Sequence, residues 1–265
     1  MTSAWRAACC VTAALMLAAC GSTPKDETSK LSVEELYAQA KDEQANGSYD
    51  KAIKLYERLE GRAAGTPLAQ QAQLELAYAH WKAGERPEAL ATIDRFMKLH
   101  PTSPAFDYAL YLKGLVNFND NLGLLGSLAA QDLSERDQQA SRDSYQAFRQ
   151  LVERFPQSKY AADARARMTY IVNSLAAYEV HVARYYYRRG AYVAAANRAQ
   201  VAVQEFQQSP AAEEALFLMA SSYDRLGLAQ LRDDAERVLR QNYPDSAYLR
   251  SGTLQEKQKA WWRLW

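Results

Sequence analysis

The stretch Thr66–Gly84, TPLAQQAQLELAYAHWKAG, sets the architecture of this chain. It opens with a hydroxyl residue and a proline, and it closes with a glycine seven positions after Ala77. A threonine at the N-cap accepts a hydrogen bond from an unpaired backbone N–H group, and a proline at the first helical position has its φ angle already set. Glycine ends a helix because it adopts the left-handed conformation without strain. The stretch therefore predicts one helix with a defined start and a defined end.

The same arrangement recurs along the chain. A small residue is followed seven positions later by a turn residue, at intervals of 37, 37, 69 and 37 residues, in the pairs Ala40/Gly47, Ala77/Gly84, Gly114/Asn121, Ala183/Gly190 and Ala220/Gly227. Nineteen residues after each of the glycines comes a hydroxyl residue: Thr66, Ser103, Ser209 and Ser246. A proline follows each of the first three, so Thr66, Ser103 and Ser209 are predicted helix N-caps. Periods near 34 residues with a helix–turn–helix pattern are typical of tetratricopeptide arrays. The sequence therefore predicts an all-α superhelix of about five helix–turn–helix repeats over residues 31–265, a fold class that binds partners.

Small side chains are expected where the paired helices approach closely. The small residue of each pair lies on the first helix of its repeat, where a bulky side chain would hold the partner helix away. The second helices carry Ala52, Ala89 and Ala195 at one equivalent position. These positions are predicted to be buried.

The single long interval divides into two insertions. Ser158 lies 37 residues after Asn121 instead of 19, which places 18 extra residues in the turn of the third repeat, near 119–137. Ala183 lies 25 residues after Ser158 instead of 11, which places 14 extra residues in the first helix of the fourth repeat, near 160–189. Because 14 residues make nearly four whole turns, the packing face stays in phase. One long helix is expected there; two helices joined near Asn173 are the alternative.

The N-terminus predicts export and a lipid anchor. Residues 1–19 form a secretory signal peptide whose apolar stretch, Ala7–Ala19, is too short to span a membrane. It ends in Leu-Ala-Ala-Cys, which resembles the lipobox of bacterial lipoproteins and implies S-diacylglycerol and N-acyl (palmitate-type) modification of Cys20. An ordinary signal peptide is the alternative. The residue after Cys20 is Gly21. An aspartate at this position would imply that the lipoprotein is retained short of the outer membrane, so the glycine implies transfer to the outer membrane. Residues 20–30 are expected to be the lipidated N-terminus and a flexible tether.

Composition excludes several functions. Loss of Arg6 with the signal peptide leaves 31 of the 32 basic residues against 31 acidic residues, which argues against nucleic-acid binding. The mature chain retains only Cys20, so it can form no disulfide. The three histidines, His80, His100 and His181, do not have metal-ligand spacing, and no nucleotide-binding loop or nucleophile motif is present. No metal, no cofactor and no enzymatic activity are predicted.

Aromatic residues gather at two places. Tyr185, Tyr186 and Tyr187 lie between arginines just before Gly190, and three consecutive helical residues cover more than one face, so at least one should face solvent. The interpretations are a partner contact, since tyrosine and arginine are favoured at interfaces, or core packing with exposed arginine heads. Near the C-terminus, Trp261, Trp262 and Trp265 share one helical stripe, for which a capping helix, a partner contact and a membrane-interface belt remain alternatives.

Four sequence runs carry a family resemblance: DYALYLKG at 107–114, SKY at 158–160, LAAYE at 175–179 and RGAYVAAANR at 189–198. With the lipobox, the five repeats and both insertions, they resemble the BamD family, also called ComL-type lipoproteins, of the β-barrel assembly machinery. The resemblance covers nearly the whole mature chain. The chain departs from the family pattern at two places, the Ala/Gly-rich segment 61–66 and the tryptophan-rich tail.

The resemblance implies a lipoprotein of the outer membrane that faces the periplasm. It implies a scaffold that assists the folding and insertion of β-barrel proteins. The implied partners are the Omp85-type (BamA-like) barrel subunit, contacted through its POTRA domains, other accessory Bam lipoproteins and unfolded barrel precursors. A tetratricopeptide lipoprotein that acts as a secretin pilotin or as a cell-wall enzyme adaptor is the alternative.

The resemblance also suggests binding residues. Arg189 and Arg198 match the family motif around the fourth turn and are candidates for ion pairs with the barrel subunit, together with Tyr185 and Tyr186. The first helices of repeats one and two supply candidates for a precursor groove: Tyr37, Tyr78 and Trp81.

The lipobox generates a direct test. A Cys20→Ala chain is expected to leave the membrane fraction, because the acyl chains that hold it there can no longer be attached. Cell fractionation with detection of the tagged chain measures this. Retention of the variant in outer membranes that lack its partner would contradict the anchor.

Overall fold

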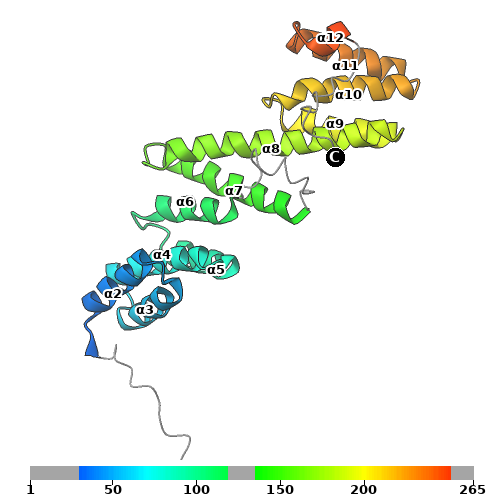
Figure 1. The fold of residues 1–265 in the computed structure, drawn as a ribbon. Helices are drawn as coiled ribbons and strands as arrows, with labels where there is room; N and C mark the ends of the chain where they lie inside the picture. Colours follow the sequence, from blue (N-terminus) through cyan, green and yellow to red (C-terminus); the bar gives the residue numbers. More distant parts are fainter. Residues whose placement is uncertain (1–29, 119–134, 252–265) are drawn as a thin grey trace, which may run out of the picture. The chain divides into compact units, whose positions relative to one another are not determined.

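The computed structural model describes residues 30–118 and 135–251, which form two compact units that divide after Phe96 (Figure 1). The signal peptide, Cys20 and the tether as far as residue 29 lie outside the described residues, as does the tryptophan-rich tail. The first unit contains two helix pairs: α2 (Val33–Ala45) with α3 (Tyr49–Arg62), and α4 (Pro67–Lys82) with α5 (Arg86–Leu99), whose last residues belong to the second unit.

The second unit continues the same alternation of helices. Its helices are α6 (Phe106–Asn117), α7 (Glu135–Arg154), α8 (Ala161–Arg188), α9 (Tyr192–Glu205), α10 (Ala211–Arg225), α11 (Ala229–Asn242) and the short α12 (Ala247–Ser251). Within the described ranges the chain contains no strand, and α2 to α11 form five helix pairs. The predicted all-α array of five helix–turn–helix repeats is therefore confirmed.

The helix starts differ in detail from the prediction. Thr66 is the N-cap of α4, with Pro67 at the first position, and its Oγ1 accepts a hydrogen bond from the N–H of Ala69 at 3.2 Å, as predicted. The predicted N-cap at Ser103 is wrong, because the Ser103 carbonyl accepts a three-residue turn bond from the N–H of Phe106 at 3.0 Å and α6 begins only at Phe106. The Ser103 hydroxyl caps that turn by accepting from the N–H of Ala105 at 3.3 Å.

Ser209 behaves in the same way. Its carbonyl accepts from the N–H of Ala212 and its hydroxyl accepts from the N–H of Ala211, so α10 begins at Ala211, one residue later than an N-cap at Ser209 would place its start.

The helix ends follow the prediction closely. The turn glycines have φ angles of 76°, 85°, 77° and 71°, in the order Gly47, Gly84, Gly190 and Gly227. The N–H of the residue after each glycine donates to a carbonyl five residues earlier, at 2.8 to 3.0 Å. This is the hydrogen bond that closes a left-handed helix end, so the glycines are confirmed as the stops of the first helices.

Tight packing between the paired helices explains the small residues. Ala40, Ala77, Ala183 and Ala220 are all buried, as are Ala52, Ala89 and Ala195 on the second helices. In the third repeat the ring of Phe148, from α7, stands against Gly114, and a Cβ added to this glycine would lie 2.3 Å from Phe148 Cε1. The Ser144 hydroxyl donates to the Gly114 carbonyl at 2.8 Å beside it. Glycine is therefore the one residue that fits position 114.

The two insertions have different outcomes. α8 is a single helix of 28 residues, so the long-helix interpretation is confirmed and the alternative of two helices near Asn173 is not. α7 has 20 residues where α3, α5, α9 and α11 have 14. Placing all 18 inserted residues in the turn was therefore wrong, because the polar run that begins at Glu135 contains no Gly or Pro and extends the second helix. Asn121 lies outside the described residues.

The core divides into clusters, as expected of repeats that contact only their neighbours. One cluster lies in the first unit, around Leu36, Tyr56 and Leu59. In the second unit, a cluster rich in large side chains surrounds Phe148 and Ile171, and the next consists largely of alanines packed with Val180 and Leu218: Ala183, Ala199, Ala202 and Ala215.

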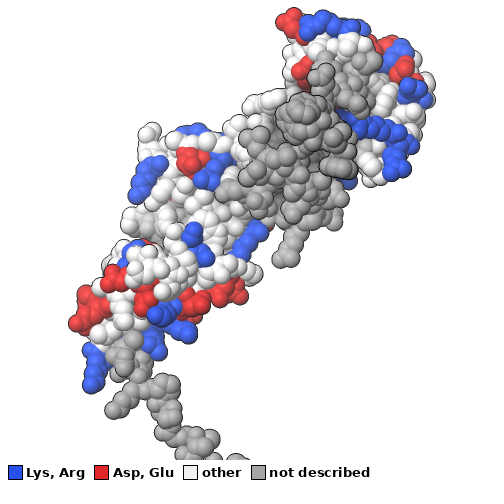
Figure 2. Space-filling model, viewed as in Figure 1, with Lys and Arg blue, Asp and Glu red and all other residues white. Residues whose placement is uncertain are grey.

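Basic and acidic side chains are interleaved on the face shown in Figure 2, and acidic ones are prominent over the first unit. Across residues 30–118 and 135–251, no helix combines the length and apolar character needed to cross a membrane.

The contact at Gly114 generates a stability prediction. Gly114→Ala should lower the free energy of unfolding by about 1–3 kcal/mol, because the new methyl group overlaps the Phe148 ring. Urea unfolding followed by far-UV circular dichroism measures this. Gly61→Ala is the matched control: Gly61 is helical and nothing lies within 4 Å of an added Cβ, so this change should stabilise by up to about 1 kcal/mol. Equal effects of the two substitutions would contradict the packing argument.

Candidate partner-binding surfaces

The turn between α8 and α9 exposes aromatic, basic and apolar groups together. Tyr185 is 52% exposed and Val193 is 60% exposed. The Arg189 guanidinium carbon lies 5.4 Å from the centre of the Tyr185 ring, and Tyr186 meets Tyr185 edge to face at 5.8 Å. Tyr187 instead packs against the alanine-rich cluster. The prediction that at least one of these tyrosines faces solvent is confirmed, and the patch offers the side chains that protein interfaces favour.

Arg198 has an internal role that the sequence did not reveal. Its Nη1 lies 3.2 Å from Oε2 of Glu179, a residue that is only 4% exposed. A buried carboxylate is costly without a partner, and the arginine supplies it. Since the Arg198 side chain is itself 45% exposed, it lies at the surface but is already engaged. Arg189, whose guanidinium lies over an exposed ring, is the better placed of the two for an external partner.

The sequence runs that suggested the family meet in pairs. The Glu179–Arg198 ion pair joins run 175–179 to run 189–198, across the turn from α8 to α9. The Ser158 hydroxyl donates to Oδ2 of Asp107 at 2.6 Å, which joins run 158–160 to run 107–114. These runs therefore hold the helices together where the two insertions interrupt the repeat.

The first helices of the first unit carry the aromatic candidates for a precursor groove. Tyr78 and Trp81 meet edge to face at 5.8 Å, and the Lys82 ammonium lies 5.6 Å from the Trp81 ring centre. Tyr37 instead lies beside Tyr56, with ring centres 6.2 Å apart. The structure thus brings Tyr78 and Trp81 together and places Tyr37 in a separate contact.

Tyr37 is tied into the fold by polar contacts. Its hydroxyl accepts a hydrogen bond from Nε2 of Gln71 on α4 at 2.7 Å. Burial raises the pKa of the Tyr37 phenol, and the Glu75 carboxylate raises it further, so the hydroxyl stays neutral. Glu75 also binds Lys41 and Gln44, at 2.9 and 2.8 Å. These contacts link the first helices of repeats one and two.

A tyrosine cluster on α6 and the start of α8 was not predicted. Tyr111 stacks on Tyr160 with ring centres 4.6 Å apart, and Tyr108 lies 5.5 Å from the same ring. The Tyr111 hydroxyl donates to Oδ2 of Asp163 at 2.8 Å; burial raises the pKa of this phenol, and the bond to Asp163 raises it further. The spacing of Tyr108 and Tyr111, one helical turn apart, was the available signal.

A second surface lies at the C-terminal end of the described chain. A cavity of about 520 Å³ is lined by α10, α11, α12 and Tyr187 of α8, and the rings of Phe217 and Tyr248 stack in it at 5.0 Å. Burial raises the pKa of the Tyr248 phenol to about 12.

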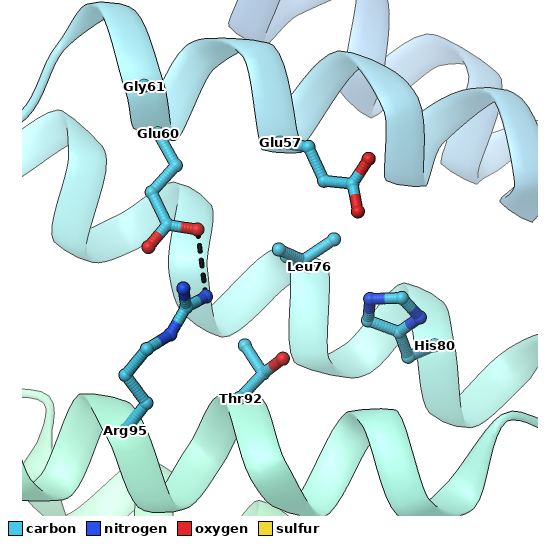
Figure 3. A pocket seen from close by; sticks show the side chains of 7 residues that line it. All are labelled: Glu57, Glu60, Gly61, Leu76, His80, Thr92 and Arg95. Carbon is cyan, nitrogen blue, oxygen red and sulfur yellow. Dashed lines mark hydrogen bonds and ion pairs between the residues drawn. The ribbon is translucent and has the colours of Figure 1, made fainter.

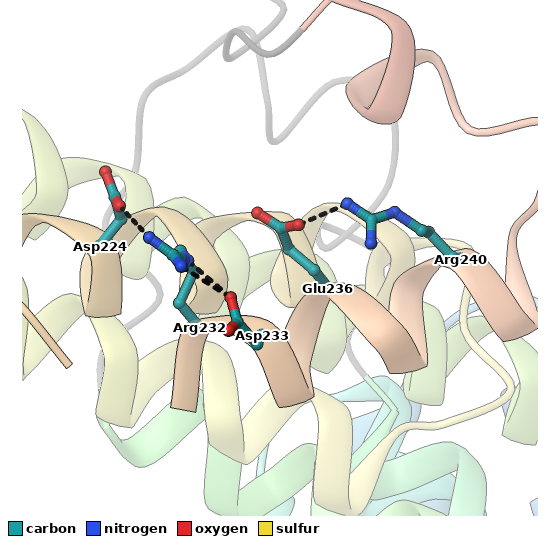
Figure 4. A network of polar contacts seen from close by, with 5 residues as sticks. All are labelled: Asp224, Arg232, Asp233, Glu236 and Arg240. Carbon is teal, nitrogen blue, oxygen red and sulfur yellow. Dashed lines mark hydrogen bonds and ion pairs between the residues drawn. The ribbon is translucent and has the colours of Figure 1, made fainter. Parts of the chain in front are cut away.

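Exposed ion pairs border this cavity (Figure 4). Arg232 binds Asp224 at 3.0 Å and Asp233 at 2.8 Å, and Arg240 binds Glu236 at 2.6 Å. Pairs exposed in this way contribute little to stability, so their charges remain available to a partner that orders them.

Nothing in the described part of the chain resembles a metal centre, since no three His, Cys, Asp or Glu side chains there are grouped to hold an ion. The structure is instead that of a helical-repeat scaffold with exposed aromatic and arginine side chains at its turns.

The chain belongs to the YfiO family of outer membrane lipoproteins, whose family model matches residues 29–239. It is 49% identical over 260 residues to the outer membrane protein assembly factor BamD of Neisseria meningitidis serogroup A, covering 96% of this chain and 97% of that protein. BamD of Xylella fastidiosa is 37% identical over 86% of this chain and 78% of its own length. A solved putative kinesin light chain from Podosopora anserina with TPR-like repeats matches 81% of this chain and 97% of its own with a TM-score of 0.41 and 13% identity, a likeness too low to carry any argument.

The buried carboxylate generates the next prediction. Arg198→Ala should lower the free energy of unfolding by about 1–3 kcal/mol, because it leaves Glu179 buried without its counter-charge. The double variant Glu179→Gln/Arg198→Ala should recover most of this loss, since a neutral amide needs no counter-ion. Thermal unfolding of both variants measures the difference. An Arg198→Ala chain as stable as the parent would show that the internal pair is unimportant.

Proposed function

We propose that this chain is the tetratricopeptide lipoprotein scaffold of the β-barrel assembly machinery and that it assists the folding and insertion of β-barrel proteins into the outer membrane. The observation that carries the proposal is 49% identity, over nearly the full length of both chains, to a protein named as an outer membrane protein assembly factor. The family description as outer membrane lipoproteins agrees with it.

The scaffold acts from the membrane surface. Acyl chains on Cys20 anchor the N-terminus, since each buried methylene group contributes roughly 0.8 kcal/mol and several chains make the anchoring stable. Cleavage after residue 19 and the polar segment to residue 30 then leave the folded body facing the periplasm. The lipobox and the signal peptide that precedes it support this arrangement.

Binding, without catalysis, is the basis of the function. The turn between α8 and α9 offers Arg189, Tyr185 and Tyr186 to the POTRA domains of the Omp85-type barrel subunit. Because these groups are already held on a helix end, little side-chain entropy is lost on binding. The exposed Tyr185 ring and the arginine over it support this assignment.

Barrel precursors are assigned to a different surface. Unfolded barrel segments are extended and rich in aromatic residues, and Tyr78 with Trp81 offers them an aromatic pair on α4. Tyr37, on α2, makes a separate contact with Tyr56. Other accessory Bam lipoproteins are further partners in the same complex.

Co-purification tests the proposal. A tagged full-length chain, isolated from native membranes in mild detergent, is expected to bring down an Omp85-type barrel subunit in stoichiometric amount, identified by mass spectrometry. Arg189→Glu should reduce that amount severalfold, because it reverses the charge beside Tyr185. Arg165→Glu is the matched control: it makes the same charge change at an exposed position near the other end of α8.

Two results would count against the proposal. Recovery of a secretin, a pilus component or a cell-wall enzyme in place of the barrel subunit would replace the function. An equal loss of the barrel subunit with Arg165→Glu and Arg189→Glu would keep the function but remove the assignment of the turn as its binding site.

A further inference from the structure

A cavity of about 510 Å³ opens in the first unit between α3, α4 and α5 (Figure 3). α3 and α5, the second helices of repeats one and two, form its two walls, and α4 lies behind them. Tyr37, Tyr78 and Trp81 do not line it. The cavity is therefore distinct from the aromatic surface assigned to barrel precursors.

The carboxylates of the cavity are unequally partnered. Glu60 Oε2 lies 2.9 Å from Nη2 of Arg95, so these two charges neutralise each other across one end. Glu57, one turn earlier on α3, has no hydrogen-bond or ion-pair partner within the described ranges, and its carboxylate points toward His80 in Figure 3. The cavity thus keeps one free negative charge.

Two buried polar groups face the same space. His80 is 8% exposed and Thr92 is 7% exposed, and both line the cavity. Nδ1 of His80 lies 2.6 Å from Oε2 of Glu85, and because a carboxylate only accepts, Nδ1 carries the proton. In the neutral ring Nε2 is then an acceptor, and Figure 3 shows it directed into the cavity below Glu57.

Thr92 adds a second unused group. Its hydroxyl has no hydrogen-bond partner among the described residues, and its oxygen is not among the buried atoms left unpaired, so it reaches the open space of the cavity.

These groups have the chemistry of a lysine site. Acceptors from three helices, one of them a full negative charge, match the three donors of an ammonium group. Leu76 lies between them and offers an apolar surface to a methylene stem. Arginine fits less well, because its planar fork prefers a bidentate carboxylate, and Glu60 is already taken by Arg95.

Gly61 indicates that the lysine comes from a polypeptide. It lies in the last turn of α3 beside the cavity, has no positive φ, and has nothing within 4 Å of the position of a Cβ. The fold therefore does not require a glycine there, and glycine in a helix costs about 1 kcal/mol relative to alanine. Its one effect is a bare helix surface at the mouth of the cavity, where another backbone can approach closely.

We propose that the cavity between α3, α4 and α5 binds one lysine side chain presented by an extended segment of a partner protein. Glu57 binds the ammonium group, His80 and Thr92 accept its remaining hydrogen bonds, and Gly61 admits the backbone on either side of the lysine. The proposal does not depend on the function proposed above.

Nuclear magnetic resonance of the full mature chain in detergent, labelled at histidine, tests the site. The chain has three histidines, so the imidazole signals are few, and His80→Gln identifies the one required. The probe is the capped peptide Gly-Gly-Lys-Gly-Gly, which should shift the His80 signal and leave the His181 signal unchanged. The same peptide with norleucine, which keeps the stem and lacks the ammonium group, should shift neither.

Variants separate recognition from stability. Glu57→Gln should weaken binding of the lysine peptide at least about tenfold, because it removes a charge-assisted hydrogen bond. Glu88→Gln, on an exposed carboxylate of α5 outside the cavity, should leave binding unchanged. Gly61→Leu should raise Tm by a few degrees, since leucine is a far better helix former than glycine. It should also weaken binding of the peptide at least about tenfold while leaving Nα-acetyl-lysine amide unaffected, because the new side chain blocks the peptide backbone alone.

Three outcomes would overturn the proposal. The His80 signal could fail to move with the lysine peptide, or it could move equally with the norleucine peptide. Binding of Nα-acetyl-lysine amide without binding of the peptide would make the cavity a site for free amines and would remove the partner protein.

Discussion

Everything in this array depends on paired helices packing so tightly that, at one position of each first helix, a methyl group is the largest side chain that fits. The contact at Gly114 is the extreme case, since the Phe148 ring occupies the space that a Cβ would need. In the other repeats an alanine holds the same place. Because the helices of a pair pack this tightly, the left-handed glycine between them must reverse the chain within a few residues. The aromatic and charged side chains that do not fit inside are left at the turns and along the outer faces.

The parts of the fold that could be predicted are those with local causes. Helix ends were predicted because a glycine at φ near 80° and the bond that follows it involve only neighbouring residues. The exposure of Tyr185 followed from the geometry of three consecutive helical positions. The start of α7 was missed because the sequence spacing gives the number of inserted residues but does not say which of them are helical. The starts of α6 and α10 were missed because a serine–proline pair can form a turn first.

The sites were harder to predict because their parts come from distant positions. Arg198 was assigned to a partner from its place in a motif, yet its carboxylate, on Glu179, lies nineteen positions earlier and on the preceding helix. The cavity in the first unit needs Glu57, His80 and Thr92, which come from three helices and share no motif. Sequence spacing reveals a site when one element supplies it, and these sites are assembled by packing.

The length of α8 gives the second unit a mechanical property. Its N-terminal part packs through Ala164 and Ile171 into the cluster around Phe148, and its C-terminal part packs through Val180 and Ala183 into the alanine-rich cluster. One helix of 28 residues, roughly 42 Å long, therefore belongs to two cores at once. In a regular array each repeat can unfold locally by itself. Here neither core can open without disturbing α8, because the other core packs against the same helix. A load applied at the turn after α8 is passed along this helix to the tyrosine cluster at its N-terminal end, so the two cores of the second unit are mechanically coupled.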